Sequence, residues 1–148
     1  MLKILGKRSS INVRKVLWTC DEVGLTYQQE DYGSGFQPVD TAEFRALNPN
    51  GLVPVLLDDD FVLWESNSIC RYLTRKTGRE DLLPVTPQGA ADVERWMDWQ
   101  ATEFNNAWRY AFMGLVRKDP RFQDPVAIKE SIAAWTRCVQ IVESQLQR

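Results

Sequence analysis

Two pairs of neighbouring residues in the middle of the chain could together hold a small peptide-like ligand, Val53-Pro54 and Glu65-Ser66. A backbone corner at a proline can offer main-chain N–H and C=O groups to an extended peptide. A serine at a helix start can bind a carboxylate beside the free N–H groups of the first turn. Each pair also has an ordinary structural interpretation, because Pro54 could be a trans proline that opens a strand and Glu65-Ser66 a plain helix cap.

A second polar group precedes the first predicted helix. Ser9, Ser10 and Asn12 come just before apolar residues that recur at helical spacing from Val13 to Cys20. A hydroxyl at this position could donate to an anion, and the unpaired N–H groups of the helix would favour the same negative charge. The residues are also common helix caps, and the pattern by itself favours that interpretation.

Several kinds of chemistry are excluded by composition. The chain has no histidine, which excludes a Ser-His-Asp triad, a histidine general base and a histidine-ligated metal site. Its three cysteines, Cys20, Cys70 and Cys138, are too far apart for a CxxC pair. Each falls within a helical pattern, so we expect a small apolar side chain in the core rather than a disulfide or a catalytic thiol.

The overall charge and hydropathy indicate a globular protein. The 148 residues carry a net charge of −2 and contain no basic block, so nucleic acid is not an expected partner. No apolar run approaches the roughly 20 residues of a membrane span. Residues 1–6 are too short for a signal peptide and lead directly into a strand pattern, which favours a cytoplasmic location.

The first half of the chain alternates between predicted strands and helices. Strands are expected at residues 2–5, 25–30, 55–57 and 61–64, and helices at 13–20, 43–47 and from about 66. Gly24 follows the first helix at the position of a C-terminal cap. Ile69, Cys70, Tyr72 and Leu73 form the expected buried face of the third helix.

The second half is predicted to be helical. A linker is expected at 79–87, one helix from about 88 to 116 and another from about 128 to 146, with a loop between them at 117–125. Apolar stripes follow both helices, and aromatic residues at such spacing usually belong to a core. Two helices are too few to cover both stripes, so we expect further helices or a partner to do so.

Four segments in this order resemble the cytosolic glutathione transferases, in particular serine-type members similar to the theta and related bacterial classes. The segments are Ser9–Val16, Asn48–Pro54, Leu63–Ile69 and Trp96–Gln100. The resemblance implies a thioredoxin-like α/β domain of order βαβαββα over residues 1–78, the linker 79–87, and an all-α domain over 88–148. It also implies that the all-α domain is incomplete, because the family's later helices have no counterpart here.

The resemblance assigns expected roles to residues of the candidate site. Ser10 would donate to the thiolate of glutathione, with Asn12 assisting or replacing it and Ser9 as the neighbouring alternative. Val53 and a cis Pro54 would pair with the cysteinyl main chain, and Glu65 and Ser66 would bind the γ-glutamyl end. Leu52 would bind through its backbone alone, although many relatives carry a basic residue at that position.

The function implied is a glutathione S-transferase that activates the thiol of glutathione for attack on a hydrophobic electrophile. Glutathione would be the co-substrate and no metal is expected. A role in detoxification, a cytoplasmic location and a homodimer are implied too, without nucleic acid or membrane partners. The alternatives are a glutathione-dependent disulfide or peroxide reductase, and a non-catalytic module that binds glutathione or a protein.

Overall fold

The computed structural model of the protein describes residues 1–147. The chain forms two compact units, Met1–Ala91 and Asp92–Arg148. The elements of the first unit are β1 (Leu2–Leu5), α1 (Ile11–Glu22), β2 (Gln28–Glu30), α2 (Ala42–Leu47), β3 (Val55–Asp58), β4 (Phe61–Trp64) and α3 (Ser66–Lys76). The order βαβαββα is the one predicted for a thioredoxin-like domain, and the prediction is confirmed.

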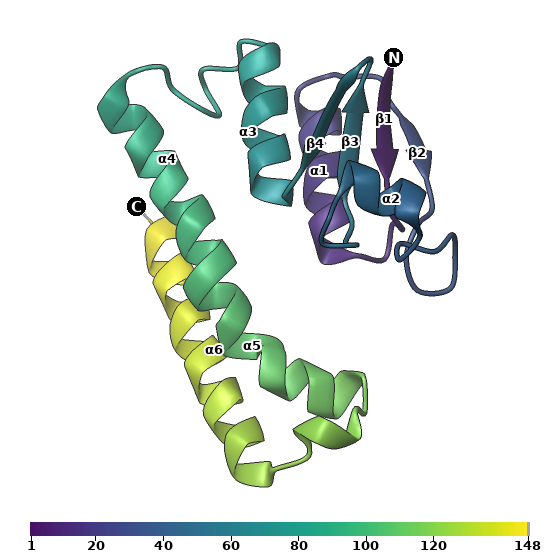
Figure 1. Ribbon diagram of the computed structural model, residues 1–148. Coiled ribbons are helices and arrows are strands. Elements are labelled where there is room, and N and C mark those ends of the chain that lie inside the picture. Colours follow the sequence, from purple (N-terminus) through teal and green to yellow (C-terminus); the bar gives the residue numbers. More distant parts are fainter. Residues whose placement is uncertain (148) are drawn as a thin grey trace. The chain divides into compact units, whose positions relative to one another are not determined.

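The first unit is built on a four-stranded mixed sheet of strand order β2-β1-β3-β4 (Figure 1). β1 and β2 are parallel, as expected when a helix connects them, and β3 is antiparallel to both β1 and β4. The hairpin register pairs Val55 with Trp64 and Asp58 with Phe61. The turn before β3 and the start of α3 therefore meet at one end of this hairpin.

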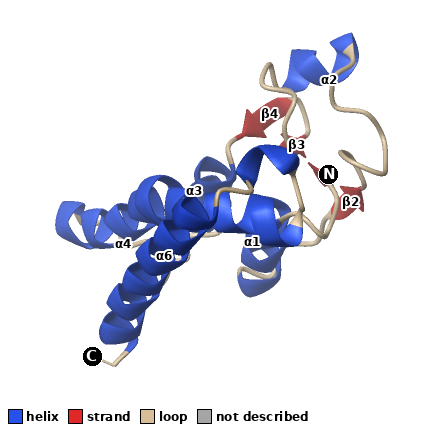
Figure 2. Cartoon of the chain, turned by 90° about the horizontal axis from the view of Figure 1, so that it is seen from below, coloured by secondary structure: helices blue, strands red, loops and turns tan. Residues whose placement is uncertain are grey.

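Helices cover both faces of the sheet. Figure 2 shows the strands in red, with α2 on one side and α1 and α3 on the other. α1 packs against α3, and both helices bury fully the apolar side chains that face the sheet: Val13, Val16, Cys20, Ile69 and Leu73. On the opposite face Phe44 of α2 packs against Leu5 and Val55. The sheet is thereby fixed between two apolar layers that hold the ends of its strands in place.

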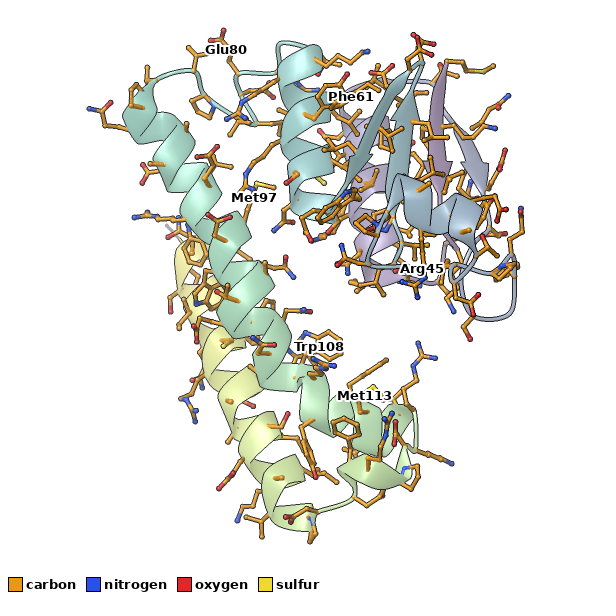
Figure 3. The ribbon with its side chains drawn as sticks, in the orientation of Figure 1. Arg45, Phe61, Glu80, Met97, Trp108 and Met113 are labelled. Atoms are coloured by element: carbon orange, nitrogen blue, oxygen red, sulfur yellow. The ribbon has the colours of Figure 1, made fainter. Side chains whose placement is uncertain are left out.

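Two details of α1 and α3 test the sequence interpretation. Gly24 follows α1 with φ +71°, a left-handed conformation that glycine adopts without steric cost, as expected for a C-terminal cap. Tyr72 was expected on the buried face of α3 but is only partly buried. Its ring lies beside Phe61 of β4, labelled in Figure 3, and its hydroxyl donates to Asp58 at 2.6 Å. A phenol needs a polar partner, which the sheet edge supplies and the core would not.

The segment after α3 is anchored to the first unit. Leu83 is buried, and the Arg79 Nη1 atom donates to the Glu22 carbonyl at the end of α1, at 2.6 Å. Arg79 also forms a bidentate pair with Asp81. Part of the predicted linker 79–87 thus packs as ordered structure on the first unit.

The second unit is all-helical. Its elements are α4 (Pro87–Trp99), which begins in the first unit, then η1 (Gln100–Phe104), α5 (Asn105–Ala111), η2 (Phe112–Val116), η3 (Pro120–Phe122) and α6 (Pro125–Leu146). α6 runs back alongside the preceding helical segment (Figure 1). None of the helices in residues 1–147 has the length and apolar character needed to span a membrane.

The single helix expected over 88–116 is wrong in detail, because two π-helical turns, η1 and η2, interrupt it. A π-helical turn alters the i→i+4 hydrogen-bond pattern of a helix. Ser131 of α6 binds beside η2: its Oγ accepts from the Ala111 N–H at 3.1 Å and donates to the Ala107 carbonyl at 2.6 Å. Gly114 is also required here, since a Cβ atom on it would lie 2.2 Å from the Phe122 carbonyl oxygen.

The apolar stripe of α6 is largely exposed within this chain. Trp135 and Val139 are each 45% exposed, and Ile132 is 43% exposed. Solvent-facing side chains of this size at helical spacing indicate a surface that packs against further structure. The expectation that two helices cannot cover both stripes agrees with this exposure.

Candidate functional site

A pocket of about 270 Å³ lies in the first unit, where the turn before β3 meets the start of α3. It is lined by Asn12, Asn48, Asn50, Leu52, Val53, Pro54, Trp64, Glu65 and Ser66. These residues come from α1, from the loop between α2 and β3, and from the junction of β4 with α3. The pocket therefore joins segments that are far apart in the sequence and that the sheet brings together.

The loop before β3 is held by Asn48, which is buried. The Asn48 amide nitrogen donates to the Leu52 carbonyl at 2.8 Å, and its oxygen accepts from the main-chain N–H and the side-chain amide of Asn50. Gly51 has φ +61°, which favours glycine, and a Cβ atom there would lie 3.0 Å from the Val39 carbonyl oxygen. This network fixes the conformation of the chain that leads to Val53.

The Val53–Pro54 peptide bond is cis, as the sequence interpretation predicted. Val53 precedes the first ladder residue of β3, Val55, and lines the pocket. Among residues 1–147 no hydrogen bond occupies its main-chain N–H or C=O. The N–H can donate to an extended peptide and the C=O can accept from it, in the manner of an added strand.

The start of α3 presents an acidic and a hydroxyl side chain to the pocket. Glu65 is the N-cap residue, and its carboxylate accepts from the Asn67 N–H at 3.5 Å, at the long limit of a hydrogen bond. Its φ of +75° is rare for a residue with a side chain, and such outliers cluster at ligand-binding positions. Ser66 is only 4% exposed and begins the helix, where free N–H groups favour an anion.

A partly buried cation lies behind this helix start. The Lys15 Nζ atom of α1 donates to the Asn67 side-chain oxygen at 2.7 Å. Burial lowers the pKa of Lys15, while the nearby Cys70 and Glu65 act in the opposite direction. The ammonium thus adds positive potential on the side of the pocket where Glu65 and Ser66 lie.

Ser10 and Asn12 both lie at the start of α1, but they differ in their relation to the pocket. Asn12 lines the pocket directly. Ser10 occupies the N-cap position with extended backbone angles, yet its hydroxyl makes no capping hydrogen bond. It is not among the pocket-lining residues, although it is only two residues before Asn12. The ordinary capping interpretation would require the Ser10 hydroxyl to accept a hydrogen bond from the first turn of α1, and the hydroxyl makes no such bond.

The structure brings together six of the seven residues predicted for the site, all except Ser10: Asn12, Leu52, Val53, Pro54, Glu65 and Ser66. Three further lining residues, Asn48, Asn50 and Trp64, were missed as site residues. The two asparagines lie in the segment Asn48–Pro54 that carries the resemblance, but no role was predicted for them. Trp64 could have been noticed as a large aromatic side chain immediately before the predicted helix cap.

No cysteine within residues 1–147 lines this pocket. Cys20 is fully buried, and burial raises the pKa of its thiol to about 12. Burial also raises the pKa of Cys70. Residues 1–147 contain no cluster of histidine, cysteine and carboxylate side chains suited to a metal ion. The pocket has groups that bind a peptide and stabilise an anion, and a nucleophile would have to arrive with the ligand.

Comparison with known proteins gives consistent matches over both units. A family model described as "Glutathione S-transferase, N-terminal domain" matches residues 9–76. Glutathione S-transferase GstB of Escherichia coli K12 is 41% identical over 150 residues, which cover 100% of this chain and 72% of that protein. Glutathione S-transferase 3 of Zea mays is 39% identical over 123 residues, which cover 78% of this chain and 53% of the maize protein.

A solved structure agrees closely with the fold. The crystal structure of a theta class glutathione S-transferase from Xanthomonas axonopodis pv. citri, with glutathione bound, superimposes with a TM-score of 0.90. The two chains are 38% identical, and the match covers 99% of this chain and 70% of that one. The likeness thus includes the helical unit as well as the pocket-bearing α/β unit.

Proposed function

The chain belongs to the glutathione S-transferase family, and from this premise we propose that it binds glutathione in the pocket described above and activates its thiol for attack on a hydrophobic electrophile. The observation that carries the proposal is the joining of Val53, Glu65 and Ser66 in one pocket. These three residues match the three parts of a γ-glutamyl-cysteinyl peptide: a main chain, an ammonium and a carboxylate.

Binding is proposed to use the two segments that meet at one end of the hairpin, the turn before β3 and the start of α3. The γ-glutamyl carboxylate would accept from the Ser66 hydroxyl and the N–H groups at the start of α3, and its ammonium would donate to Glu65. The cysteinyl main chain would pair with Val53. This arrangement directs the thiol towards the start of α1, where Ser10 and Asn12 lie.

Activation requires that the bound thiol ionise near neutral pH. A free thiol has a pKa of about 8.5, and lowering it by about 2 units requires about 2.7 kcal/mol of preferential stabilisation of the thiolate. Ser10, whose hydroxyl is not used as a cap, would donate to the sulfur. Asn12 would add an amide donor, and the N-terminus of α1 would favour the negative charge.

The reaction itself involves one new bond. The thiolate sulfur attacks an electrophilic carbon and forms a C–S bond. In a substitution, the leaving group departs with the bonding electron pair. In an addition, the electron pair moves onto the adjacent atom, which then takes up a proton from solvent.

The test combines binding with turnover. Glutathione binding is measured by isothermal titration calorimetry, and turnover with chlorodinitrobenzene by absorbance. Ser66→Ala should weaken glutathione binding by about 10- to 150-fold, since a charge-assisted hydrogen bond contributes about 1.5–3 kcal/mol. Ser68→Ala serves as the control, because Ser68 lies on the same helix but outside this pocket. Equal affinity of both variants would contradict the proposed γ-glutamyl site.

A second candidate is a glutathione-dependent disulfide reductase. The resemblance suggests this activity for family members in which an asparagine contacts the thiol, and Asn12, rather than Ser10, lines the pocket. In this reaction the glutathione thiolate attacks a substrate disulfide, forms a mixed disulfide and releases one thiolate. The same preparation is assayed with hydroxyethyl disulfide and with chlorodinitrobenzene. A higher kcat/KM for the disulfide would favour the reductase, and a higher kcat/KM for chlorodinitrobenzene would favour the transferase.

We further propose a homodimer, a cytoplasmic location and a role in detoxification, with no metal in the reaction. Support for self-association comes from exposed apolar side chains on edge strand β4 (Phe61, Val62 and Trp64) and along α6. Large exposed apolar surfaces commonly mark protein interfaces. Analytical ultracentrifugation that finds only monomer at micromolar concentration would contradict the dimer.

A further inference from the structure

The pocket offers no counter-charge for the second carboxylate of glutathione, the one on its glycyl residue. We propose that the site binds γ-glutamyl-cysteinyl peptides that end in a neutral group at least as well as glutathione itself. The thiol substrate class would then be γ-Glu-Cys peptides, with Leu52 as the residue that sets this tolerance. The inference rests on the proposed function, because it specifies the ligand of the same site.

The direction of the bound peptide follows from the charges of the pocket. Glu65 and Ser66 match the ammonium and carboxylate of the γ-glutamyl end, so that end belongs at the start of α3. The register pairs Val55 with Trp64, which places Pro54 opposite Glu65. A peptide that pairs with Val53 must therefore continue away from Glu65, along the loop that contains Leu52.

This far end of the pocket is neutral. Of the residues within 1–147 that line it, Glu65 alone has an ionisable side chain, and it lies at the other end. Leu52 is 64% exposed and presents an apolar side chain. The Asn48 amide is engaged on both of its atoms, and the Asn50 amide nitrogen already donates to Asn48 at 3.0 Å.

Two cations beside the pocket-forming segments, Arg45 and Lys15, bond to other groups. The Arg45 guanidinium, labelled in Figure 3, lies beside the loop, where its carbon would be 3.4 Å from a Cβ atom on Gly51. Its Nη1 atom donates to the Pro49 carbonyl at 3.2 Å, and Arg45 is not a lining residue. Lys15 donates to Asn67, at the γ-glutamyl end. A glycyl carboxylate would thus remain hydrated at the open end of the pocket.

A hydrated carboxylate without a partner contributes little to affinity. Replacement of the carboxylate by a carboxamide keeps the size of the group and removes only its charge. The amide should consequently bind with a similar Kd. A lysine at position 52 would create an exposed ion pair with the free carboxylate, and such pairs change affinity by about two- to fivefold.

The experiment compares glutathione with its C-terminal amide by isothermal titration calorimetry. For the unmodified chain, the Kd values of the two peptides should agree within about threefold. Leu52→Lys should tighten glutathione by about two- to fivefold and leave the amide unchanged, whereas Val85→Lys, the charge-matched control outside the pocket, should change neither. Leu52 and Val85 are both exposed, so neither substitution should disturb folding.

Two outcomes would overturn the inference. Glutathione could bind more than about threefold more tightly than the amide, and loss of this preference in Arg45→Gln would identify Arg45 as the group that reads the carboxylate. This outcome leaves the proposed function intact. Failure of both peptides to bind at millimolar concentration would instead overturn the proposed function, and the inference with it.

Discussion

The Lys15 ammonium on α1 donates to the Asn67 side chain in the first turn of α3, with 2.7 Å between Nζ and Oδ1. Asn67 is 5% exposed and follows Ser66 directly. The bond joins the two helices whose N-termini face the proposed ligand. Desolvation lowers the pKa of Lys15, and the Asn67 oxygen replaces part of the water that the ammonium loses.

Lys15→Met is expected to lower the free energy of unfolding by about 1–3 kcal/mol, because it leaves a buried amide oxygen without this donor. Asn67→Ala should cost a similar amount, and the double variant should cost less than the sum by about 1 kcal/mol. Urea unfolding of the four proteins measures this coupling. Lys129→Met, at an exposed position of α6, is the control and should stay within about 0.5 kcal/mol. Strict additivity of the two substitutions would show that the bond has no energetic role.

Ser10→Ala separates a capping role from a catalytic one. A capping serine would cost about 1 kcal/mol of stability when truncated, but the Ser10 hydroxyl makes no cap bond, so we expect little change. Loss of a donor to the thiolate should raise the pKa of bound glutathione by about one to two units. The pH profile of kcat/KM should then shift to higher pH, with activity at pH 6.5 reduced by about tenfold or more.

Ser9→Ala is the matched control for this experiment, because Ser9 is exposed and adjacent. Its pH profile should coincide with that of the unmodified chain. If Ser10→Ala instead lowered the melting temperature and left the profile in place, the serine would be a cap and the thiolate donor would be Asn12. The Asn12→Ala variant, measured in the same way, would then show the shift.

Much of the first unit could be predicted because its signals are local. The helical spacing from Val13 to Cys20 and the hairpin around residues 55–64 depend on neighbouring residues only, and both agree with the structure. The pocket residues were recognisable because Val53-Pro54 marks a backbone corner and Glu65-Ser66 places two polar side chains at a helix start. The β2 strand is shorter than expected, since only Gln28–Glu30 pairs with β1.

The features that were not predicted depend on distant partners. The π-helical turn η2 lies where Ser131, 20 residues beyond Ala111, takes the Ala111 N–H. The role of Asn48 depends on a loop that returns to it through Leu52 and Asn50. No periodicity or motif encodes such pairings, because they arise only once the elements have packed.

The acid stability of the first unit should depend on Asp58. Lys76 and then Tyr72 hydrogen-bond its carboxylate and lower its pKa. A carboxyl group with a depressed pKa in the folded state contributes its full stabilisation above the unfolded pKa of about 3.9, and loses it as pH falls through the folded value. Tyr72→Phe removes one of these bonds, so it should cost about 0.5–1 kcal/mol at pH 7 and progressively less as pH falls below the unfolded pKa of about 3.9.

Urea unfolding at pH 7 and at pH 2.5 measures this difference. Tyr27→Phe is a suitable control, because the Tyr27 hydroxyl donates to Asp21 at 3.2 Å in an exposed position. Its effect should be smaller at pH 7, as expected for a solvated pair. If the stability lost in Tyr72→Phe were the same at both pH values, the hydrogen bond to the Asp58 carboxylate would not be its source. The hydroxyl would then act by positioning the Tyr72 ring against Phe61.

Ser131→Ala tests whether the helical unit is held by a single side chain at its π-helical turn. Ser131 is 8% exposed and bonds both to the Ala111 N–H and to the Ala107 carbonyl. Truncation would leave a buried N–H unpaired, which should cost about 1–3 kcal/mol. Because the two units are compact bodies, the loss should be local: hydrogen exchange should accelerate for α5 and α6 amides and not for β1 and β3.

Ser144→Ala, at an exposed position on α6 where the hydroxyl donates to the Gln140 carbonyl, should leave both sets unchanged. Equal acceleration in both units after Ser131→Ala would show that they unfold together, and no acceleration would show that solvent replaces the serine at Ala111.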